Sequence, residues 1–383
     1  MAFSVNGGNV TDVFITDAEF IDRFVGNQLW LWGQGAAGAL GNNSIVSRSS
    51  PVQTVSNTTD WRQVDTSVGT SAAIKTNGTL WVWGTATGGA LGNNSTINRS
   101  SPVQTVSVGT NWKQVSTGYQ AQSAIKTDGT LWVWGCAALG TLGNNSTINR
   151  SSPVQTVSVG TNWKQVSVRG RTMAAIKTDG TLWLWGQGAV GRLGNESTTN
   201  RSSPVQTVSA ETNWAKVAST GYNTAAIKTD GTLWLWGQGT FGSLGNNSTL
   251  NEVSPVQTVA AGTNWKQVGG YDNLTAAIKT DGTLWLWGYN LYGGLGNNSV
   301  ASLSSPVQTI AAGTNWKQVA AGGYTTAAVK TDGTLWLWGK GGCGNFGNNS
   351  TLNRSSPVQT IAAGTNWKQV SAGDNISAVT FNS

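Results

Sequence analysis

The chain has 383 residues, of which 10% are charged, with a net charge of +7, no His, two Cys, seven Pro and 21 Trp. Without His it cannot form a Ser-His-Asp or Cys-His catalytic arrangement or a His-ligated zinc site, and two Cys are too few for a four-thiolate site. We therefore expect no enzyme, no catalytic residues, no metal and no cofactor. No run of Lys or Arg suggests nucleic-acid binding, and no stretch is apolar and long enough for membrane insertion.

Residues 1–25 precede the repeated part of the chain, which we assign to 26–383. They contain four carboxylates and one Arg, and 16–19 (Thr-Asp-Ala-Glu) is typical of a capping box that begins a short helix. The first residues lack the basic start and apolar run of a secretion signal. Two roles remain open, because the segment can cover one face of the repeated part or anchor the chain to a partner. The anchor candidates are its apolar residues: Phe3, Val13, Phe14, Ile15, Phe20 and Phe24.

A unit of 51 residues recurs seven times along the rest of the chain. The first Trp of each Leu-Trp-Leu-Trp-Gly or Leu-Trp-Val-Trp-Gly run recurs at this step. A second and a third Trp and one Pro keep the same step, so they account for every Trp and Pro in the chain. The first set comprises Trp30, Trp81, Trp132, Trp183, Trp234, Trp285 and Trp336.

Within each unit, polar and apolar residues alternate with the period of β-strands. Four short strands are predicted, which we call A, B, C and D; in one copy they are 163–167, 173–177, 181–185 and 204–208. Asp-Gly between strands B and C indicates a tight hairpin, and the Pro that opens strand D suits an edge strand. Four strands in each of seven units predict an all-β fold, a seven-bladed β-propeller, with the Trp residues packed between blades.

The two ends of the chain complete each other. The first repeat begins at strand C (29–33), and the last repeat stops after a segment that resembles strand B (377–381). Strands A and B from the end of the chain and strands C and D from its beginning therefore make one blade. This closes the ring and removes its open edges.

The repeat resembles that of the regulator of chromosome condensation family. The residues that carry the resemblance are Gly-x-Leu-Gly-Asn-Asn-Ser, Pro-Val, Trp-Lys-Gln-Val-Ser-x-Gly and Ala-Ala-Ile-Lys-Thr-Asp-Gly-Thr-Leu-Trp-Leu-Trp-Gly, over 29–381. The resemblance implies a seven-bladed propeller closed by both ends. Family repeats usually carry a His after strand A, which is absent here, and they are more diverged. The near-identical copies are interpreted as a phage or bacterial type.

Two segments differ in nearly every copy, namely the A–B turn and the segment that follows strand C. Since the strands are antiparallel, both lie at the same end of the propeller, while the nearly constant B–C and D–A turns lie at the other. All six Tyr fall in the two variable segments. Tyr in variable loops on a rigid scaffold is typical of recognition surfaces. The alternative is that the copies differ in these loops by neutral drift, because loops tolerate substitutions. The candidate partner-binding residues are Tyr119, Gln120, Arg169, Arg171, Met173, Tyr222, Asn223, Phe241, Tyr271, Asp272, Tyr289, Tyr292 and Tyr324.

These features predict a non-enzymatic binding or structural protein whose variable face recognises a protein or a cell-surface glycan. Recent amplification of the repeat and a possible anchor favour a virion-attached fibre or decoration protein of a phage, held to other virion proteins by residues 1–25. The first alternative is an intracellular, cytoplasmic regulatory propeller, either similar to a guanine-nucleotide exchange factor or acting as a protein scaffold. A second alternative is a lectin that uses the opening of the propeller shaft.

Overall fold

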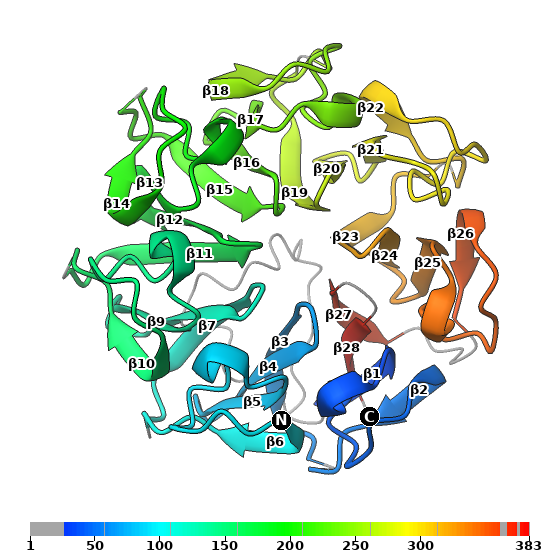
Figure 1. Ribbon diagram of the computed structural model, residues 1–383. Coiled ribbons are helices and arrows are strands. Elements are labelled where there is room, and N and C mark those ends of the chain that lie inside the picture. Colours follow the sequence, from blue (N-terminus) through cyan, green and yellow to red (C-terminus); the bar gives the residue numbers. More distant parts are fainter. Residues whose placement is uncertain are drawn as a thin grey trace, which may run out of the picture.

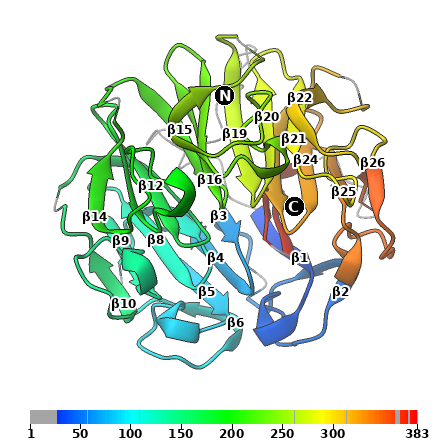
Figure 2. The same ribbon diagram turned by 45° about the horizontal axis from the view of Figure 1, so that its top comes forward.

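The computed structural model describes residues 27–382, apart from 57, 108, 159, 209, 261, 312, 361–365 and 374–375. The anchor candidates of residues 1–25 lie outside the described part. The described residues form a ring of four-stranded antiparallel sheets around a central axis (Figure 1). The tilted view shows the blades side by side around that axis (Figure 2).

Four strand positions repeat from blade to blade. The A strands are β3 (Trp61–Thr66), β7 (Trp112–Thr117), β11 (Trp163–Arg169), β15 (Trp214–Ser219), β19 (Trp265–Tyr271), β23 (Trp316–Gly322) and β27 (Trp367–Ala372). The B strands are β4 (Thr70–Lys75), β8 (Ala121–Lys126), β12 (Thr172–Lys177), β16 (Asn223–Lys228), β20 (Leu274–Lys279), β24 (Thr325–Lys330) and β28 (Ile376–Asn382). The C strands are β1 (Asn27–Gly33), β5 (Leu80–Gly84), β9 (Leu131–Gly135), β13 (Leu182–Gly186), β17 (Leu233–Gly237), β21 (Leu284–Gly288) and β25 (Leu335–Gly339). The D strands are β2 (Arg48–Gln53), β6 (Arg99–Gln104), β10 (Arg150–Gln155), β14 (Arg201–Gln206), β18 (Glu252–Gln257), β22 (Leu303–Gln308) and β26 (Arg354–Gln359).

Short 3₁₀ helices follow six of the C strands in the described part of the chain. They are η2 (Ala36–Gly38), η3 (Thr87–Gly89), η4 (Ala138–Gly140), η5 (Ala189–Gly191), η6 (Thr240–Gly242) and η7 (Gly342–Gly344). The sequence predicts that Pro is the first residue of each D strand. In the structure the D strands begin three residues before the Pro. A register irregularity interrupts the pairing around it, as between Arg150 and Val154. The Pro is tolerated because it sits at this irregularity on an edge strand.

Six sheets consist of four consecutive strands each, from β3–β6 to β23–β26. A seventh sheet has the order β2-β1-β28-β27 and joins the two ends of the chain. In it, β1 and β28 pair over seven residues, from Asn27 with Asn382 to Gly33 with Ile376. The predicted all-β propeller of four-stranded blades, closed by strands from both ends, is confirmed.

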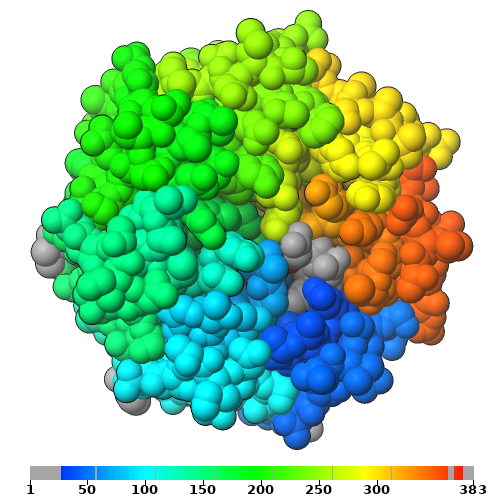
Figure 3. Space-filling model, viewed as in Figure 1, coloured from blue at the N-terminus to red at the C-terminus, as the bar shows by residue number. Residues whose placement is uncertain are grey.

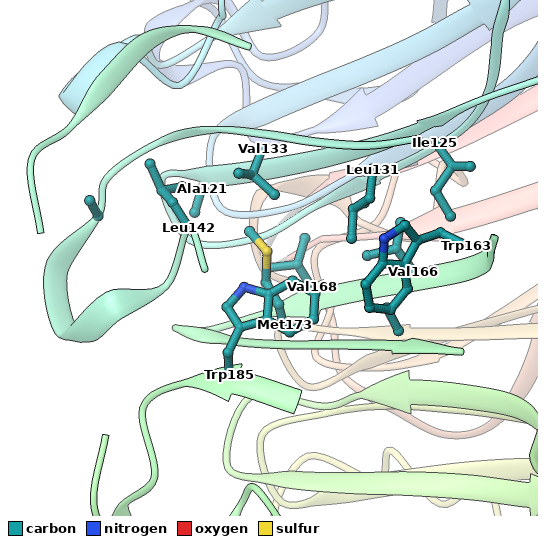
Figure 4. Close-up of a cluster of buried hydrophobic side chains, with 12 residues drawn as sticks. Ala121, Ile125, Leu131, Val133, Leu142, Trp163, Val166, Val168, Met173 and Trp185 are labelled. Atoms are coloured by element: carbon teal, nitrogen blue, oxygen red, sulfur yellow. The ribbon is translucent and has the colours of Figure 1, made fainter. Parts of the chain in front are cut away.

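The hydrophobic core is divided among the interfaces between neighbouring blades. One cluster combines Leu131 and Val133 of one blade with Trp163, Val166 and Trp185 of the next (Figure 4). The Trp that opens strand A and the second Trp of strand C pack edge to face, with ring centroids of Trp163 and Trp185 6.2 Å apart. The predicted inter-blade role of these Trp residues is confirmed.

The first Trp of each C strand is only partly buried and has a different role. Trp132 donates its indole N–H to the Thr130 hydroxyl over 2.9 Å, and Thr130 donates to Asp128 over 2.7 Å. The Lys126 ammonium lies over two rings, 4.5 Å from the Trp132 centroid and 4.9 Å from that of Trp112. Cation–π contacts therefore fix the lysines that precede the B–C turns.

A polar ladder also joins the A strands of neighbouring blades. Gln114 donates from Nε2 to the Val166 carbonyl over 3.0 Å, and its Oε1 accepts the Val166 N–H over 3.1 Å. The same two bonds recur at the equivalent residues Gln63, Gln165, Gln267, Gln318 and Gln369. These buried or half-buried amides bond in both directions, so they fix the angle between blades.

The B–C turns are held by contacts with the next blade. Gly129 has φ +79°, and a Cβ there would lie 2.0 Å from the Thr161 carbonyl oxygen. Its own carbonyl accepts the Trp163 N–H over 3.0 Å. Only Gly fits this close approach with a positive φ, so packing alone explains why the turn barely changes between copies.

The B–C turns predict an acid-sensitive contribution to stability. The Thr130 hydroxyl and N–H hold the pKa of Asp128 below its usual range, and the four equivalent aspartates behave alike. A lowered pKa in the folded state stabilises the protein above the unfolded-state pKa, and this stabilisation is lost as the pH falls through the folded-state value. We therefore expect a chain with Asn at positions 128, 179, 230, 281 and 332 to lose less stability than the wild type between about pH 5 and about pH 3.

The first repeat supplies the control for this prediction. Asn77 stands in place of Asp and accepts the same two bonds, from the Thr79 N–H over 3.1 Å and the Thr79 hydroxyl over 2.8 Å. The variant should therefore keep its turns and its neutral-pH stability. Denaturant titrations at both pH values measure the difference, and parallel acid losses in the two proteins would contradict the prediction.

The Gly-Asn-Asn-Ser loops join blades at the outer rim. In the Asn145 loop, the Asn145 N–H donates to the Ser202 carbonyl over 2.8 Å with φ +57°. Glu196 holds the equivalent position at φ +57° and is exposed. Asn tolerates this left-handed conformation better than Glu. Glu196→Asn is expected to raise the free energy of unfolding by about 1 kcal/mol, and Asn145→Glu to lower it by about as much. Thermal and denaturant unfolding measure both, and a stabilising Asn145→Glu would contradict the account.

Candidate protein-binding face

The A–B turns and the segments after the C strands form one end of the ring, which we call the variable face. In six blades of the described part a backbone hydrogen bond joins the two segments, for example from Cys136 N–H to the Gln120 carbonyl over 2.7 Å and from Lys340 N–H to that of Tyr324 over 3.0 Å. The predicted placement of both segments at one end is confirmed. Neighbouring blades meet closely around the ring (Figure 3).

The tips of six post-C segments have an unusual backbone. A positive φ recurs at their equivalent positions, but not at Tyr292 in the seventh, and one of the six positions holds Gly88, the residue best suited to that conformation. Larger residues stand at the others, including Val190 with φ 58° and Phe241 with φ 60°. β-branched or bulky side chains in the left-handed region are strained, and such strain persists where the surrounding structure enforces it. The tips therefore project side chains at a cost in stability.

Aromatic side chains from three consecutive blades gather on one part of this face. Phe241 lies edge-on to Tyr289 with ring centroids 4.8 Å apart, and Tyr324 is 5.2 Å from Tyr289 and 5.3 Å from Tyr292. The Lys340 ammonium is 5.3 Å from the Tyr292 ring centroid and 5.6 Å from that of Tyr324. We call these five residues the aromatic patch.

The patch offers exposed apolar area. Phe241 is 43% exposed, and Leu291 beside Tyr292 is 56% exposed. Burial, and secondarily Tyr292, raises the pKa of Tyr289, so its hydroxyl is protonated at neutral pH and can donate a hydrogen bond. The patch thus combines aromatic surface, hydroxyl groups and one cation.

Two other predicted tyrosines pair with arginines elsewhere on the face. Tyr119 lies 5.9 Å from the Arg171 guanidinium, and Tyr222 lies 4.9 Å from that of Arg192. Arg192 is buried and donates to the Gly221 carbonyl over 2.9 Å. Burial lowers its pKa, although the residue stays charged at neutral pH. Each tyrosine is 39% exposed, so these pairs remain accessible.

Some predicted contact residues are not available to a partner. Met173 is 0% exposed and packs in the core between two blades, and Asn223 is 2% exposed and bonded to Thr220. Tyr271 is 9% exposed. Met173 and Tyr271 pack in clusters between blades, and Asn223 bonds within its own blade, so the structure does not expose these three side chains to a partner. Gln120 and Asp272 adopt positive φ values of 62° and 50° in their turns and are half-buried.

Arg169, another predicted contact residue, spans the axis of the ring. Its guanidinium donates to the Thr66 carbonyl over 2.9 Å and to the Ala372 carbonyl over 3.2 Å. It also lies 5.4 Å from the Tyr271 ring centroid. Because these partners come from three other blades, Arg169 closes the shaft at the variable face. A ligand site in the shaft opening at this end, as in the lectin alternative, is not favoured.

The described residues contain no group of three or more Cys, Asp or Glu that could hold a metal ion. Within the same residues, no helix has the length and apolar character to cross a membrane. Residues 28–379 match the family model of the RCC1-like domain. The chain belongs to this family.

Relatives of this RCC1-like propeller span most of its length. It is 27% identical to the ultraviolet-B receptor UVR8 of Arabidopsis thaliana over 334 residues, which are 85% of this chain and 76% of the relative. It is 28% identical to the mitochondrial RCC1 domain-containing protein RUG3 of the same plant over 354 residues, 82% of this chain and 77% of the relative. Prp20p from Saccharomyces cerevisiae superimposes with a TM-score of 0.83 at 17% identity, over 93% of this chain and 92% of that one. That identity supports the shared fold alone.

Sequence reasoning missed three residues of the variable face of this RCC1-like domain, namely Arg192, Leu291 and Lys340. Leu291 and Lys340 stand in the post-C segments where the copies differ, so a comparison of the copies could have identified both as candidate contact residues. Arg192 lies just beyond such a segment and replaces the small residues of most other copies.

Proposed function

We propose that this RCC1-like propeller is a non-enzymatic regulatory protein that binds a protein partner through its variable face. The aromatic patch is the centre of the binding site, and the pairs Tyr119–Arg171 and Tyr222–Arg192 extend it around the ring. The aromatic patch is the single observation that carries this proposal. Tyr, Trp and Arg are the residues that most often dominate the binding energy of protein interfaces, and aromatic anchors with adaptable neighbours are typical of recognition surfaces.

The strained tips favour selection for binding over drift. Drift in a tolerant loop would be expected to accept Gly or Asn at positions with positive φ, because these residues relieve the strain. Val190 and Phe241 instead maintain the strain, because a β-branched or bulky side chain stands at a positive φ. The constancy of the B–C turns carries less weight, because contacts such as that of Gly129 with Thr161 constrain them. The side chains of the variable face therefore support partner binding more strongly than does the difference in sequence variability between the two ends.

The relatives support a protein partner rather than a glycan. Prp20p was described with its binding to Gsp1p and histones, all of which are proteins. The similar proteins named above come from a plant and a yeast, and none is named as a virion component. The proposal therefore follows the intracellular regulatory alternative and not attachment to a phage particle. The division into an extension, residues 1–25, and a propeller, 26–383, remains a prediction, as does anchoring by the extension.

Affinity purification from the cells of origin tests the proposal. The tagged full-length chain should retain a protein that a chain with Phe241, Tyr289 and Tyr324 changed to Ala does not retain, while both chains keep the same melting temperature to within a few degrees. Equal retention by both chains would contradict a site at the aromatic patch. If the retained protein is a small GTPase, accelerated nucleotide release in its presence distinguishes an exchange factor from a scaffold.

A further inference from the structure

The shaft of the propeller holds a cavity of about 360 Å³ that the A strands line. Its wall includes the inter-blade glutamines, such as Gln114 and Gln318, and small residues such as Gly269 and Ala320. Arg169 also lines it and closes the end at the variable face. The other end of the shaft lies beside the D–A turns.

A basic residue from every blade stands at this second end. In six blades it directly follows the Trp that opens strand A, and in the blade of β15–β18, where Ala215 follows Trp214, Lys216 stands one position later, at the place that the inter-blade Gln holds in the other blades. We call this set the basic ring: Arg62, Lys113, Lys164, Lys216, Lys266, Lys317 and Lys368.

The Arg62 guanidinium is buried and donates to the Trp112 and Lys113 carbonyls over 2.6 and 3.0 Å, and some of the lysines lie close enough to affect one another. Lys113, Lys164 and Lys216 line the shaft cavity. Burial, and secondarily Lys266, lowers the pKa of Lys317, and burial with Lys317 lowers that of Lys368. Like charges that face a partly buried space repel one another, and an anion placed among them removes this repulsion.

The carboxylates at this end of the ring interact with lysines that are not members of the basic ring. Asp60 pairs with Lys75, at an N–O distance of 3.3 Å, and Glu211 with Lys228, at 2.7 Å. Asp128 lines a second hollow of about 340 Å³ with Lys113 and Lys164, and its negative charge also interacts with the nearby Lys126 ammonium. The positive potential of the basic ring is therefore only partly offset by its neighbours.

We propose that the basic ring binds a compact multivalent oxyanion, of the oligophosphate class, at the mouth of the shaft. The cations surround one axis instead of following a track, and the shaft is closed at its far end. This arrangement suits a small anion with several charged oxygens better than an extended nucleic acid, which needs a continuous path for its phosphates. The site lies at the opposite end from the aromatic patch, so it does not depend on the proposed function.

Calorimetric titration of the full-length chain with inorganic tripolyphosphate tests this inference. The wild type is expected to bind with saturation near one anion per chain, and the anion should raise its melting temperature. A chain with Lys266, Lys317 and Lys368 changed to Gln is expected to bind more than about tenfold more weakly, because it loses three charge-assisted contacts. Its melting temperature without the anion shows that it is folded.

The matched control removes the same three charges from the other end of the molecule. Arg99, Arg201 and Arg354 are exposed and begin D strands, which start beside the variable face. Changing these three to Gln should weaken binding by no more than about twofold, since distant exposed charges are screened by salt. Equal weakening by both variants, or no saturable binding to the wild type, would overturn the inference.

Discussion

Trp134→Ala is expected to lower the free energy of unfolding by about 3–5 kcal/mol, the range for removing a large aromatic side chain from a packed core. Trp134 is 0% exposed, and its ring lies 6.4 Å from that of Trp112. Its indole N–H donates to the Ala90 carbonyl of the preceding blade over 3.0 Å. Removing it leaves a cavity between two blades and an unpaired buried carbonyl. Denaturant titration followed by tryptophan fluorescence measures the loss.

Trp132, two residues earlier in the same strand, provides the control. It is partly exposed, and its partners are the Thr130 hydroxyl and the Lys126 ammonium. Trp132→Ala is expected to cost only about 1–2 kcal/mol, as partial burial and a cation–π contact suggest. If both variants lose the same free energy, the inter-blade core is not concentrated at the second Trp of strand C.

Changing both Tyr289 and Tyr324 to Ala is expected to weaken binding of the partner at least about 30-fold, which corresponds to about 2 kcal/mol and to the loss of one interface hot spot. The two rings lie 5.2 Å apart, and each contacts Tyr292. Their loss removes the middle of the aromatic patch and leaves the inter-blade core intact. Titration of the purified partner against each variant gives the dissociation constants.

Tyr119→Ala is the matched control for this change. Tyr119 is 39% exposed on the same face, but it belongs to the blade of β7–β10 on the other side of the ring. We expect it to weaken binding much less than the double change. A larger effect of Tyr119→Ala would move the binding site away from the aromatic patch.

The strict 51-residue period made most of the fold predictable. Each repeat supplies a hairpin signal, alternating strands and three Trp, and these local signals agree with a closed ring. The pairing of β1 with β28 followed from where the repeats begin and end. The A, B and C strands differed from the predicted bounds by one or two residues, and the D strands began three residues earlier, because the Pro lies inside each strand at a register irregularity.

The candidate site was less predictable because it depends on side-chain direction. β19 continues to Tyr271, so this residue packs in the cluster between two blades instead of projecting from a turn. Met173 lies within β12, where alternation directs it into the core. The aromatic patch combines residues from three blades, and the ring contacts between blades join residues 32 or more positions apart in the sequence. A comparison of copies shows that such positions vary, but not that their rings meet.

Hydrogen–deuterium exchange of the full-length chain, with and without its purified partner, tests the central claim most directly. Partner binding is expected to slow exchange in the peptides that cover 238–244, 289–293, 323–326 and 340–343, which carry the aromatic patch and its supporting turns. The peptides that cover the B–C turns should be unchanged. Protection confined to the B–C and D–A turns, with no change at the variable face, would contradict the account.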